Sequence, residues 1–588
     1  MRRNYILIVC AALIAILPLL VYGCSCGHDF DFHLQSWMDA AQQLRHGTLQ
    51  PHWIFSAAYN AGEPRFIFYP PISWMLGALL TLFLPATMLP AIYTFIVLTA
   101  AGLAMYRLAV HFAAPNAALI AATLYIVNPY MLFTAYERTA YAELLAAAWL
   151  PLLFLAILRA RPTIRGIALP VALLWLTNAP AAVMGCYALA LVMAVRITLS
   201  LRRTKPVLEP ASEPMQLAII SIAGTALGLA LPAFYLIPAA YERRFVQIAM
   251  AIIPNMRFQD NFLFGHTGDV PHDQVLHTAS VLALILLGTT AGVLLALFWR
   301  GSRKTATTEP ASEPPIEPST NVSLALVTVC IGLLLIPFST PLWNHLPELA
   351  FLQFPWRLMS VLAVVLGLGI SLLLRNARAT VAVPAALVLA AALTFVAFPA
   401  FRQPCEDVDL PSTRAALFAN HQGIEPTDEY TPNEADNDVL RDNDPPFWLS
   451  PDPAAFAPDT TPNPGTPLAP ADRPVGETSA IAAPRTTAPL MFSPGTFTVS
   501  AAAPEFLILN LRRYPAWHIS VNGHDAPPYD GPPRDDGLIV VPVDPGVATV
   551  QIDWHRTPDQ QLGIAISGIS LLIYAGLVLR ARSRRIGA

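Results

Sequence analysis

Long apolar runs recur along almost the whole chain, and they constrain its fold more than any other feature. The chain has 588 residues, of which 55% are hydrophobic and only 13% are charged, whereas a soluble protein carries about 25% charged residues. Surface helices of soluble proteins keep a polar face at helical period, but these runs are apolar on all sides. They are typical of helices solvated by lipid and predict a polytopic α-helical membrane protein.

Twelve of the runs approach the length of about 20 residues that a membrane crossing needs. They lie near residues 5–23, 88–107, 115–135, 142–158, 165–179, 181–200, 215–240, 275–299, 321–338, 356–374, 380–399 and 561–580. A further apolar stretch, residues 72–85, is too short to span, so we expect a juxtamembrane or re-entrant helix there. Alternatively, the first run is a cleaved signal peptide, because it follows Met1-Arg2-Arg3.

Cytoplasmic loops of membrane proteins carry an excess of lysine and arginine. With the spans given above, the turns that are rich in these residues all lie on one side of the membrane. These turns include residues 159–165, 196–205, 300–304, 375–378 and 580–585. Both termini are then cytoplasmic in a bacterial inner membrane. The segments predicted to lie outside are 24–87, 136–141, 241–274, 339–355 and 400–560.

The large outer segment divides into two parts by composition. Residues 401–493 are rich in Pro, Asp, Thr and Ala, which predicts a partly disordered linker. Short strands with turns between them, such as Asn522-Gly523, predict a small β-sandwich at 494–558. These strands are expected at residues 496–500, 505–510, 517–521, 538–543 and 547–553. The remaining units are a membrane domain at 1–400, with the outer loop 24–87, and a last span with a basic tail at 559–588.

Charged residues are scarce inside the predicted spans and gather at their outer ends. Ion-coupled transporters carry ionisable residues within the helix bundle, so this distribution argues against ion-driven transport and favours chemistry at the outer lipid–water boundary. The chain also lacks the basic tract that nucleic-acid binding requires. The clearest polar cluster is His28-Asp29-Phe30-Asp31-Phe32-His33, directly after the first run.

Several short motifs follow one another in a suggestive order. They are Gly27-His-Asp-x-x-Phe-His33-Leu34, Gly47…Pro51-x-Trp53, Gly62-x-Pro64-x-Phe-x-Phe-Tyr69-Pro70-Pro71, Tyr141-x-Glu143, Leu231-Pro232-Ala233 with Tyr241-Glu242, Phe354-Pro-Trp-Arg357, and Tyr514-Pro-x-Trp517…Val521-Asn-Gly523. With these motifs in this order, the chain resembles integral-membrane glycosyltransferases of GT-C fold. More narrowly, it resembles bacterial membrane proteins described as 6-pyruvoyl-tetrahydropterin synthase-related, and its β-part resembles the extracytoplasmic tail of YfhO-type proteins.

The resemblance implies transfer of a sugar from a polyprenyl-(di)phosphate-linked donor to a glycan, lipid or protein acceptor. A carboxylate outside the membrane takes the proton of the acceptor hydroxyl, and Asp29 matches that position better than Asp31. Arginines stabilise the lipid phosphate as it leaves. The expected substrate-binding residues are His33, Glu63, Tyr69, Glu137, Arg138, Tyr141, Glu143, Glu242, Arg243 and Arg357. Use of a divalent metal such as Mg²⁺ or Mn²⁺ stays open.

Structural interpretations compete with these roles. Asp29 or Asp31 caps the next helix, Glu137-Arg138 and Glu242-Arg243 are ion pairs at span ends, and Arg357 is an interfacial anchor. The residues His266, Asp269, His272, Asp273 and His277 have metal-binding side chains, but a polar loop explains them as well. A disulfide from Cys24 or Cys26 to Cys405 stays open. The rival functions are a lipid-glycan flippase or scaffold and a polymerase or ligase of lipid-linked glycans.

Overall fold

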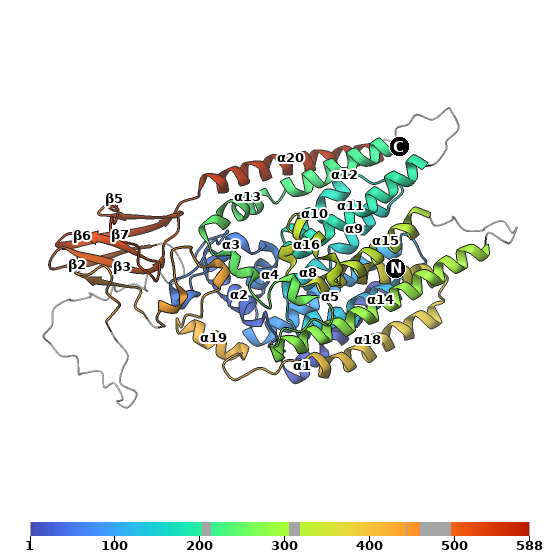
Figure 1. Cartoon of the computed structure of the whole chain (residues 1–588), viewed down its shortest axis with the longest axis horizontal. Coiled ribbons are helices and arrows are strands. Elements are labelled where there is room, and N and C mark those ends of the chain that lie inside the picture. The colour runs from blue at the N-terminus through green and yellow to red at the C-terminus, as the bar shows by residue number, and fades with distance from the viewer. Residues whose placement is uncertain (1, 203–212, 305–317, 443, 459–494, 587–588) are drawn as a thin grey trace.

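The computed structural model describes residues 2–202, 213–304, 318–442, 444–458 and 495–586. Most of these residues form a helical bundle, and a smaller β-part lies at one end of it (Figure 1). Both chain termini lie at the other end of the bundle. The last helix, α20 (Pro558–Ile586), runs from the β-part along the bundle to that far end.

Ten helical segments of the described chain are long and apolar enough to cross a membrane. The chain is therefore a multi-pass membrane protein. These segments are α1 (Arg2–Tyr22), α5 (Leu89–Ala109), α6 (Pro115–Val127) with α7 (Pro129–Tyr136), α8 (Tyr141–Ala146) with α9 (Leu150–Leu158), α11 (Ala179–Arg202), α12 (Glu213–Ala230), α14 (Val270–Lys304), α17 (Met359–Leu373), α18 (Ala379–Phe401) and α20.

Three of the twelve predicted spans are less regular than the sequence pattern indicates. The predicted span at 215–240 is divided at Pro232 into α12 and the short helix α13 (Ala233–Glu242). The predicted span at 165–179 is only a 12-residue helix, α10 (Ile164–Trp175). The predicted span at 321–338 is a pair, α15 (Pro318–Leu334) and α16 (Thr340–His345), bent by 96° at Pro337. Proline cannot donate a backbone hydrogen bond, so it breaks a helix within an apolar run that hydropathy treats as continuous.

Short helices form the end of the bundle beside the β-part. They are α2 (Phe30–Arg45), α3 (Arg65–Phe68) and α4 (Pro71–Thr81), which all lie in the segment 24–87, and α13 (Ala233–Glu242) after α12 (Figure 1). α4 coincides with the helix predicted at 72–85, and its 11 residues are too few to span. α2 lies close on α4, because a Cβ at Gly77 would be 2.2 Å from the Trp37 ring.

The β-part consists of two antiparallel sheets that share one buried apolar cluster. One sheet has the order β1 (Phe447–Ser450), β3 (Glu505–Arg512), β6 (Leu538–Val543). The other has the order β2 (Gly495–Ala501), β7 (Gly546–Trp554), β4 (Trp517–Val521), β5 (His524–Asp525). All five predicted strands are confirmed. The Asn522-Gly523 turn joins β4 to β5, and both residues have the positive φ that such a tight turn requires.

The segment expected to be a linker contributes ordered structure both to the bundle and to the β-part. It forms α19 (Pro411–Ala419) beside α2, and strand β1 of the first sheet. A disulfide between Cys26 and Cys405 joins its beginning to the chain just after α1. Residues 459–494 of this segment, and most of the two Glu-Pro-Ala-Ser-Glu-Pro repeats at 209–214 and 309–314, lie outside the described residues.

Candidate functional site

Seven of the predicted site residues meet at the bundle end that faces the β-part. They come from separate stretches of the chain: the start of α2, the end of α3, the turn after α7, α8, and a short helical turn at Pro355–Leu358 before α17. These residues are Asp29, His33, Tyr69, Arg138, Tyr141, Glu143 and Arg357. Charge and ring contacts link the group throughout.

A close backbone contact holds the start of α2 against the turn after α7. The Asp29 backbone N–H donates a 3.0 Å hydrogen bond to the carbonyl oxygen of Arg138. A Cβ on Gly27 would lie only 2.0 Å from the carbonyl oxygen of Glu137. The two segments of the chain therefore approach this closely only because residue 27 has no side chain. The contact places Asp29 directly beside Arg138.

The side chain of Asp29 has no partner among the described residues. Asp29 occupies the N-cap position of α2, but its side chain makes no capping hydrogen bond. In the part of the chain that the structure describes, its half-buried carboxylate has neither a hydrogen-bond nor an ion-pair partner. Its charge nevertheless acts on His33, Tyr69 and Arg138. Helix capping thus does not account for this carboxylate.

Glu143 is the anionic centre that holds two arginines. Its carboxylate accepts a 2.7 Å hydrogen bond from Nη1 of Arg138 and lies 3.5 Å from Nε of Arg357. The hydroxyls of Tyr130 and Ser360 also donate to it. Burial alone would lower the pKa of Arg138, but the Glu143 carboxylate outweighs this effect and raises that pKa. Two guanidinium groups around the Glu143 carboxylate leave one positive charge there, and the nearby Asp29 carboxylate balances it.

Both guanidinium groups also lie over aromatic rings. The guanidinium carbon of Arg138 is 4.6 Å from the centre of the Trp356 ring, and that of Arg357 is 4.8 Å from the centre of Phe354. The buried Nε of Arg357 and Nε1 of Trp356 have no hydrogen-bond partner. Buried donors are rarely left unpaired, so these two N–H groups favour a ligand that carries acceptor oxygens.

His33 completes the polar lining on the α2 side. Burial lowers its pKa to about 4, although the nearby Asp29 carboxylate acts in the opposite direction. The ring is therefore neutral near pH 7, and neither of its nitrogens has a hydrogen-bond partner. It makes edge contacts with Tyr69 and Tyr141 at 5.8 and 5.3 Å between ring centres. Burial and the charge of Asp29 raise the pKa of the Tyr69 hydroxyl, which stays protonated.

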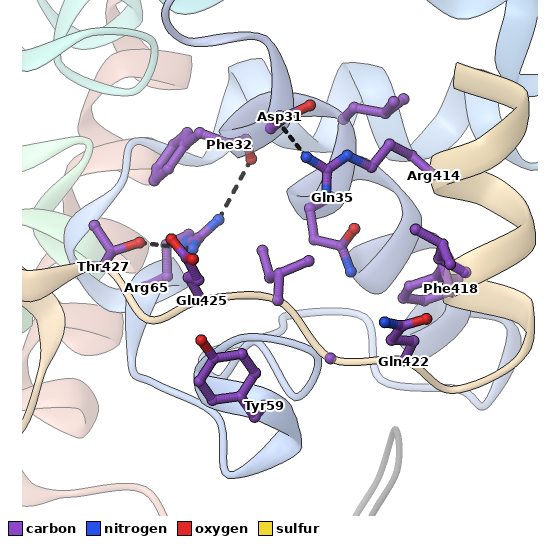
Figure 2. Close-up of a pocket in the computed structure, with 14 residues that line it drawn as sticks. Asp31, Phe32, Gln35, Tyr59, Arg65, Arg414, Phe418, Gln422, Glu425 and Thr427 are labelled. Carbon is purple, nitrogen blue, oxygen red and sulfur yellow. Dashed lines mark hydrogen bonds and ion pairs between the residues drawn. The ribbon is translucent and has the colours of Figure 1, made fainter. Parts of the chain in front are cut away.

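Asp31, the second predicted catalytic residue, faces a different part of the molecule. Its carboxylate pairs with Nη2 of Arg414 from α19 at 2.7 Å, and burial raises its pKa. It lines a separate cavity together with Gln35 and Tyr59 (Figure 2). Asp29 does not line that cavity.

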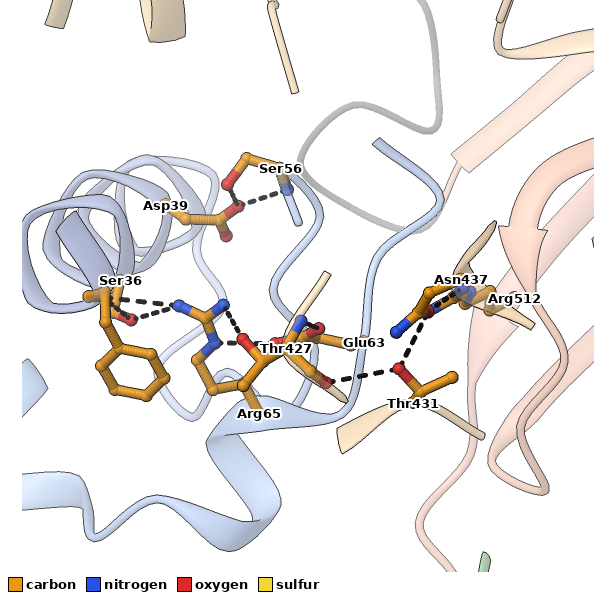
Figure 3. A network of polar contacts seen from close by, with 10 residues as sticks. Ser36, Asp39, Ser56, Glu63, Arg65, Thr427, Thr431, Asn437 and Arg512 are labelled. Atoms are coloured by element: carbon orange, nitrogen blue, oxygen red, sulfur yellow. Dashed lines mark hydrogen bonds and ion pairs between the residues drawn. The ribbon is translucent and has the colours of Figure 1, made fainter. Parts of the chain in front are cut away.

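Glu63 belongs to a buried structural network. It accepts hydrogen bonds of 2.8 Å from Nε of Arg65 and from the backbone N–H of Thr427 (Figure 3). Arg65 in turn donates to Ser36 of α2 and to the Thr427 hydroxyl. The network connects the segment 24–87 to the segment after α19. Glu63 and Arg65 therefore have a structural role.

The two ion pairs considered at the span ends are not formed. Glu137 accepts a hydrogen bond from Gln403 at 2.6 Å, and Arg138 pairs with Glu143 instead. Arg243 is exposed and lies 3.8 Å from Glu348.

Glu242 lies where the β-part meets the bundle. Its carboxylate accepts hydrogen bonds from Tyr514 at 2.6 Å, Gln560 at 2.9 Å and Thr557 at 3.0 Å. Among the predicted site residues, Asp29, Arg138 and Arg357 thus come together, while the side chains of Glu137 and Glu242 have partners elsewhere.

The side chains at the site do not fit a resident divalent cation. The oxygens of Glu143 already face two guanidiniums and two hydroxyls, which leaves Asp29 as the only carboxylate without protein partners among the described residues of the site. His266 pairs with Asp273, but the five residues at 266–277 do not gather into a metal-holding group. In the described chain, the group close enough to hold a metal is Cys24, Cys26 and Cys405, and two of these form the disulfide.

Some residues of the site carry no signal in the sequence. Tyr130 and Ser360 reach Glu143 from apolar runs, where a single hydroxyl looks like ordinary helix packing. Arg414 comes from the segment expected to be a linker. Gly27 is part of the first quoted motif, but its contact partner is 110 residues further along the chain.

Comparisons with known proteins leave the family open. No family model matches the chain, and no curated protein matches it. Among solved structures, the chain is similar to the arabinofuranosyltransferase AftD from Mycobacteria, with 17% identity and a TM-score of 0.40. The match covers 68% of this chain and 27% of that chain. So distant a likeness carries no argument about activity, and membership of the pterin synthase-related or YfhO-type groups stays a prediction.

Proposed function

We propose that this protein is a membrane glycosyltransferase. It transfers a sugar from a polyprenyl-(di)phosphate-linked donor to an acceptor on the outer face of the cytoplasmic membrane. The observation that carries the proposal is the unpaired carboxylate of Asp29 beside the two clustered arginines, Arg138 and Arg357.

Asp29 is the general base in this proposal. As the oxygen of an acceptor hydroxyl bonds to the anomeric carbon of the sugar, its proton passes to the Asp29 carboxylate. A carboxylate without protein hydrogen bonds has its lone pairs available for that proton. At the same time the bond between the anomeric carbon and the phosphate oxygen breaks, and the electron pair leaves with the lipid phosphate.

Arg138 and Arg357 stabilise the departing phosphate. Negative charge accumulates on the phosphate oxygens as the bond breaks, and guanidinium groups meet such oxygens with strong charge-assisted hydrogen bonds. Glu143 fixes the two guanidiniums in place before the donor arrives, so little reorganisation is needed during the reaction. The Nε of Arg357, which makes no hydrogen bond although it lies 3.5 Å from Glu143, supplies one of the required donors.

His33 and Tyr69 orient the sugar between the base and the phosphate site. A neutral imidazole offers one donor and one acceptor, which suits sugar hydroxyls, and both its nitrogens are unpaired here. The proton transfer and the charge stabilisation are assigned to side chains of this chain alone, and no step passes through a metal ion.

The test is a transfer assay with purified full-length protein in lipid nanodiscs. A panel of polyprenyl-phosphate and polyprenyl-diphosphate sugars serves as donors, and product formation is followed with labelled sugar. We expect Asp29→Asn to lower the rate of transfer about 10²–10⁴-fold with little change in thermal stability. Asp31→Asn, whose side chain lies in a separate cavity and not beside the arginines, should keep the wild-type kcat.

Arginine variants test the phosphate site separately. Arg138→Lys and Arg357→Lys keep the charge but lose the fork geometry that binds phosphate oxygens, so both should raise the donor KM or lower kcat. Arg243→Lys is the matched control, because Arg243 is exposed and away from the cluster. Undiminished transfer by Asp29→Asn would remove the base assignment. Movement of lipid-linked sugar across the bilayer without transfer would favour a flippase instead.

A further inference from the structure

We infer that the cavity beside Asp31 binds the acceptor as a neutral saccharide, an assignment that rests on the proposed glycosyl transfer. The cavity has a volume of about 410 Å³ and lies between the start of α2, the loop around Tyr59 and the segment from α19 to Thr427 (Figure 2). On α2, residues four apart share a face. Asp31 and Gln35 therefore face this cavity, whereas Asp29 and His33 face the arginine cluster.

Backbone contacts build the wall of the cavity rigidly. The N–H of Tyr59 donates to the carbonyl oxygen of Ile424 at 2.9 Å, and the N–H of Ile424 donates to that of Ser56 at 2.8 Å. A Cβ on Gly423 would lie 2.6 Å from Cα of Tyr59. Ala58, Tyr59 and Asn60 all have positive φ, from 50° to 72°. Non-glycine residues with such φ values store strain and cluster at functional sites.

Unpaired polar groups point to a ligand in this cavity. Gln35 is only 3% exposed, and its Nε2 has no hydrogen-bond partner. Figure 2 shows the Gln35 amide directed into the cavity. Oδ1 of Asp31 and Nε of Arg414 are also buried without partners. The cavity thus offers unpaired donors and an unpaired acceptor within a small space, and a ligand with hydroxyl groups pairs with both kinds.

The charges in the cavity favour a neutral ligand over an anion. Asp31 and Glu425 carry negative charge, and Arg65 and Arg414 carry positive charge, so the lining is balanced. Arg65 is already committed to Glu63, Ser36 and Thr427, and Arg414 to Asp31 and Asp409. A phosphate would meet no uncommitted guanidinium fork in this cavity.

Aromatic side chains supply the apolar part of the lining. Phe32, Tyr59 and Phe418 line the cavity together with Leu34 and Leu417. A sugar ring presents C–H groups on its faces and hydroxyls at its edge, so it matches a pocket that combines apolar walls with a few polar groups. Asp31, which lines the cavity, is two residues from Asp29 along the chain. The proposal places the reactive hydroxyl of the acceptor past the N-terminus of α2, at the Asp29 carboxylate.

The test measures saccharide binding without any donor. Full-length protein in nanodiscs, free of sugar-based detergent, is titrated with neutral methyl glycosides and short neutral oligosaccharides, and binding is followed by saturation-transfer NMR. We expect at least one neutral saccharide to bind. Gln35→Met should weaken its binding about tenfold, and so should Gln422→Ala, because Gln422 also lines the cavity; this is the effect of losing one or two hydrogen bonds. Gln42→Met, on the same helix but outside the cavity, should bind as the wild type does.

Gln35→Met also separates a binding role from a structural one. Because the amide has no protein partner, its replacement by an apolar side chain of similar length should leave thermal stability unchanged or raise it. A fall in stability together with unchanged binding would overturn the proposal. So would absence of binding by every neutral saccharide, or displacement of the bound saccharide by inorganic phosphate.

Transfer assays distinguish failure of this cavity from failure of the enzymatic proposal. If saccharides bind and depend on Gln35, but no donor sugar is transferred, the cavity stands as a saccharide site and the proposed function fails. If Asp29→Asn abolishes transfer while Gln35→Met leaves the acceptor KM unchanged, the proposed function stands and the cavity assignment fails.

Discussion

Replacing Gly27 by alanine tests how the site is assembled. In the structure a Cβ at this position would lie 2.0 Å from the carbonyl oxygen of Glu137 and 2.7 Å from its carbonyl carbon. Ordinary contact begins at 3.4 Å, so the oxygen is about 1.4 Å too close. Both partners are backbone, and no side-chain rotation can relieve the overlap.

The chain on the N-terminal side cannot absorb this displacement easily. Cys26, the preceding residue, is bonded to Cys405, and the Asp29 N–H is bonded to the carbonyl oxygen of Arg138. The overlap should therefore separate Asp29 from Arg138 by about 1 Å, a misplacement that costs roughly 100-fold in rate. Overpacking of this kind also costs about 1–3 kcal/mol of stability.

The assay compares the transfer rate at saturating donor and acceptor with the thermal midpoint of the same nanodisc preparation. Gly288→Ala is the matched control, because a Cβ there meets nothing within 4 Å, so the rate should stay at its wild-type value. Its thermal midpoint should stay the same or rise, because alanine favours the helix more than glycine does. If Gly27→Ala keeps the wild-type rate and midpoint, the close contact between the two loops does not position Asp29, and the reasoning is refuted.

Three further predictions concern groups around the site. Glu143→Gln should destabilise the protein by about 3–5 kcal/mol in denaturant unfolding, because it leaves two guanidiniums without their counter-charge, whereas Tyr130→Phe should cost about 1 kcal/mol for one lost hydrogen bond. Burial raises the pKa of Glu242 to about 7. Hydrogen bonds from Tyr514 and Gln560 lower this pKa, and the neighbouring Asp559 raises it further. The protonated form is therefore favoured in the fold, so its stabilising contribution is complete below pH 4.5 and is lost as the pH rises through 7. The thermal midpoint should fall between pH 5 and 8.5, and Glu242→Gln should flatten that slope; an unchanged slope would contradict the assignment. Because Sγ of Cys24 lies 3.4 Å from Sγ of Cys405, Cys26→Ser should transfer the disulfide to Cys24, and non-reducing peptide mapping that finds free Cys24 and Cys405 would disprove this.

The general architecture could be predicted from composition and periodicity. Lipid requires long apolar helices, because every backbone polar group must be satisfied within the segment, so hydropathy locates most spans. Alternating residues and turn signals located all five predicted strands of the β-part. These features are local, and a local pattern in the sequence is enough to find them. The prolines that separate α12 from α13, and α15 from α16, can be seen in the sequence. The sequence pattern does not show that they break a continuous apolar run into two helices.

The charged residues at the ends of the spans could be predicted as a set, but their division into groups could not. Asp29 and Asp31 look alike in the sequence, yet one lies free beside Arg138 and the other is paired with Arg414. The difference arises because residues two apart at a helix start face different neighbours, and those neighbours come from α7–α8 and from α19.

The sequence by itself determined that this is a multi-pass membrane protein with charge gathered at the ends of its spans and a small β-part. Only the tertiary structure decided which charges meet. Glu143 brings Arg138 and Arg357 together, while Glu63 and Glu242 serve other contacts. The physical reason is that hydrophobic pattern fixes each helix separately, whereas a site depends on distances between residues that are tens to hundreds of positions apart in the chain.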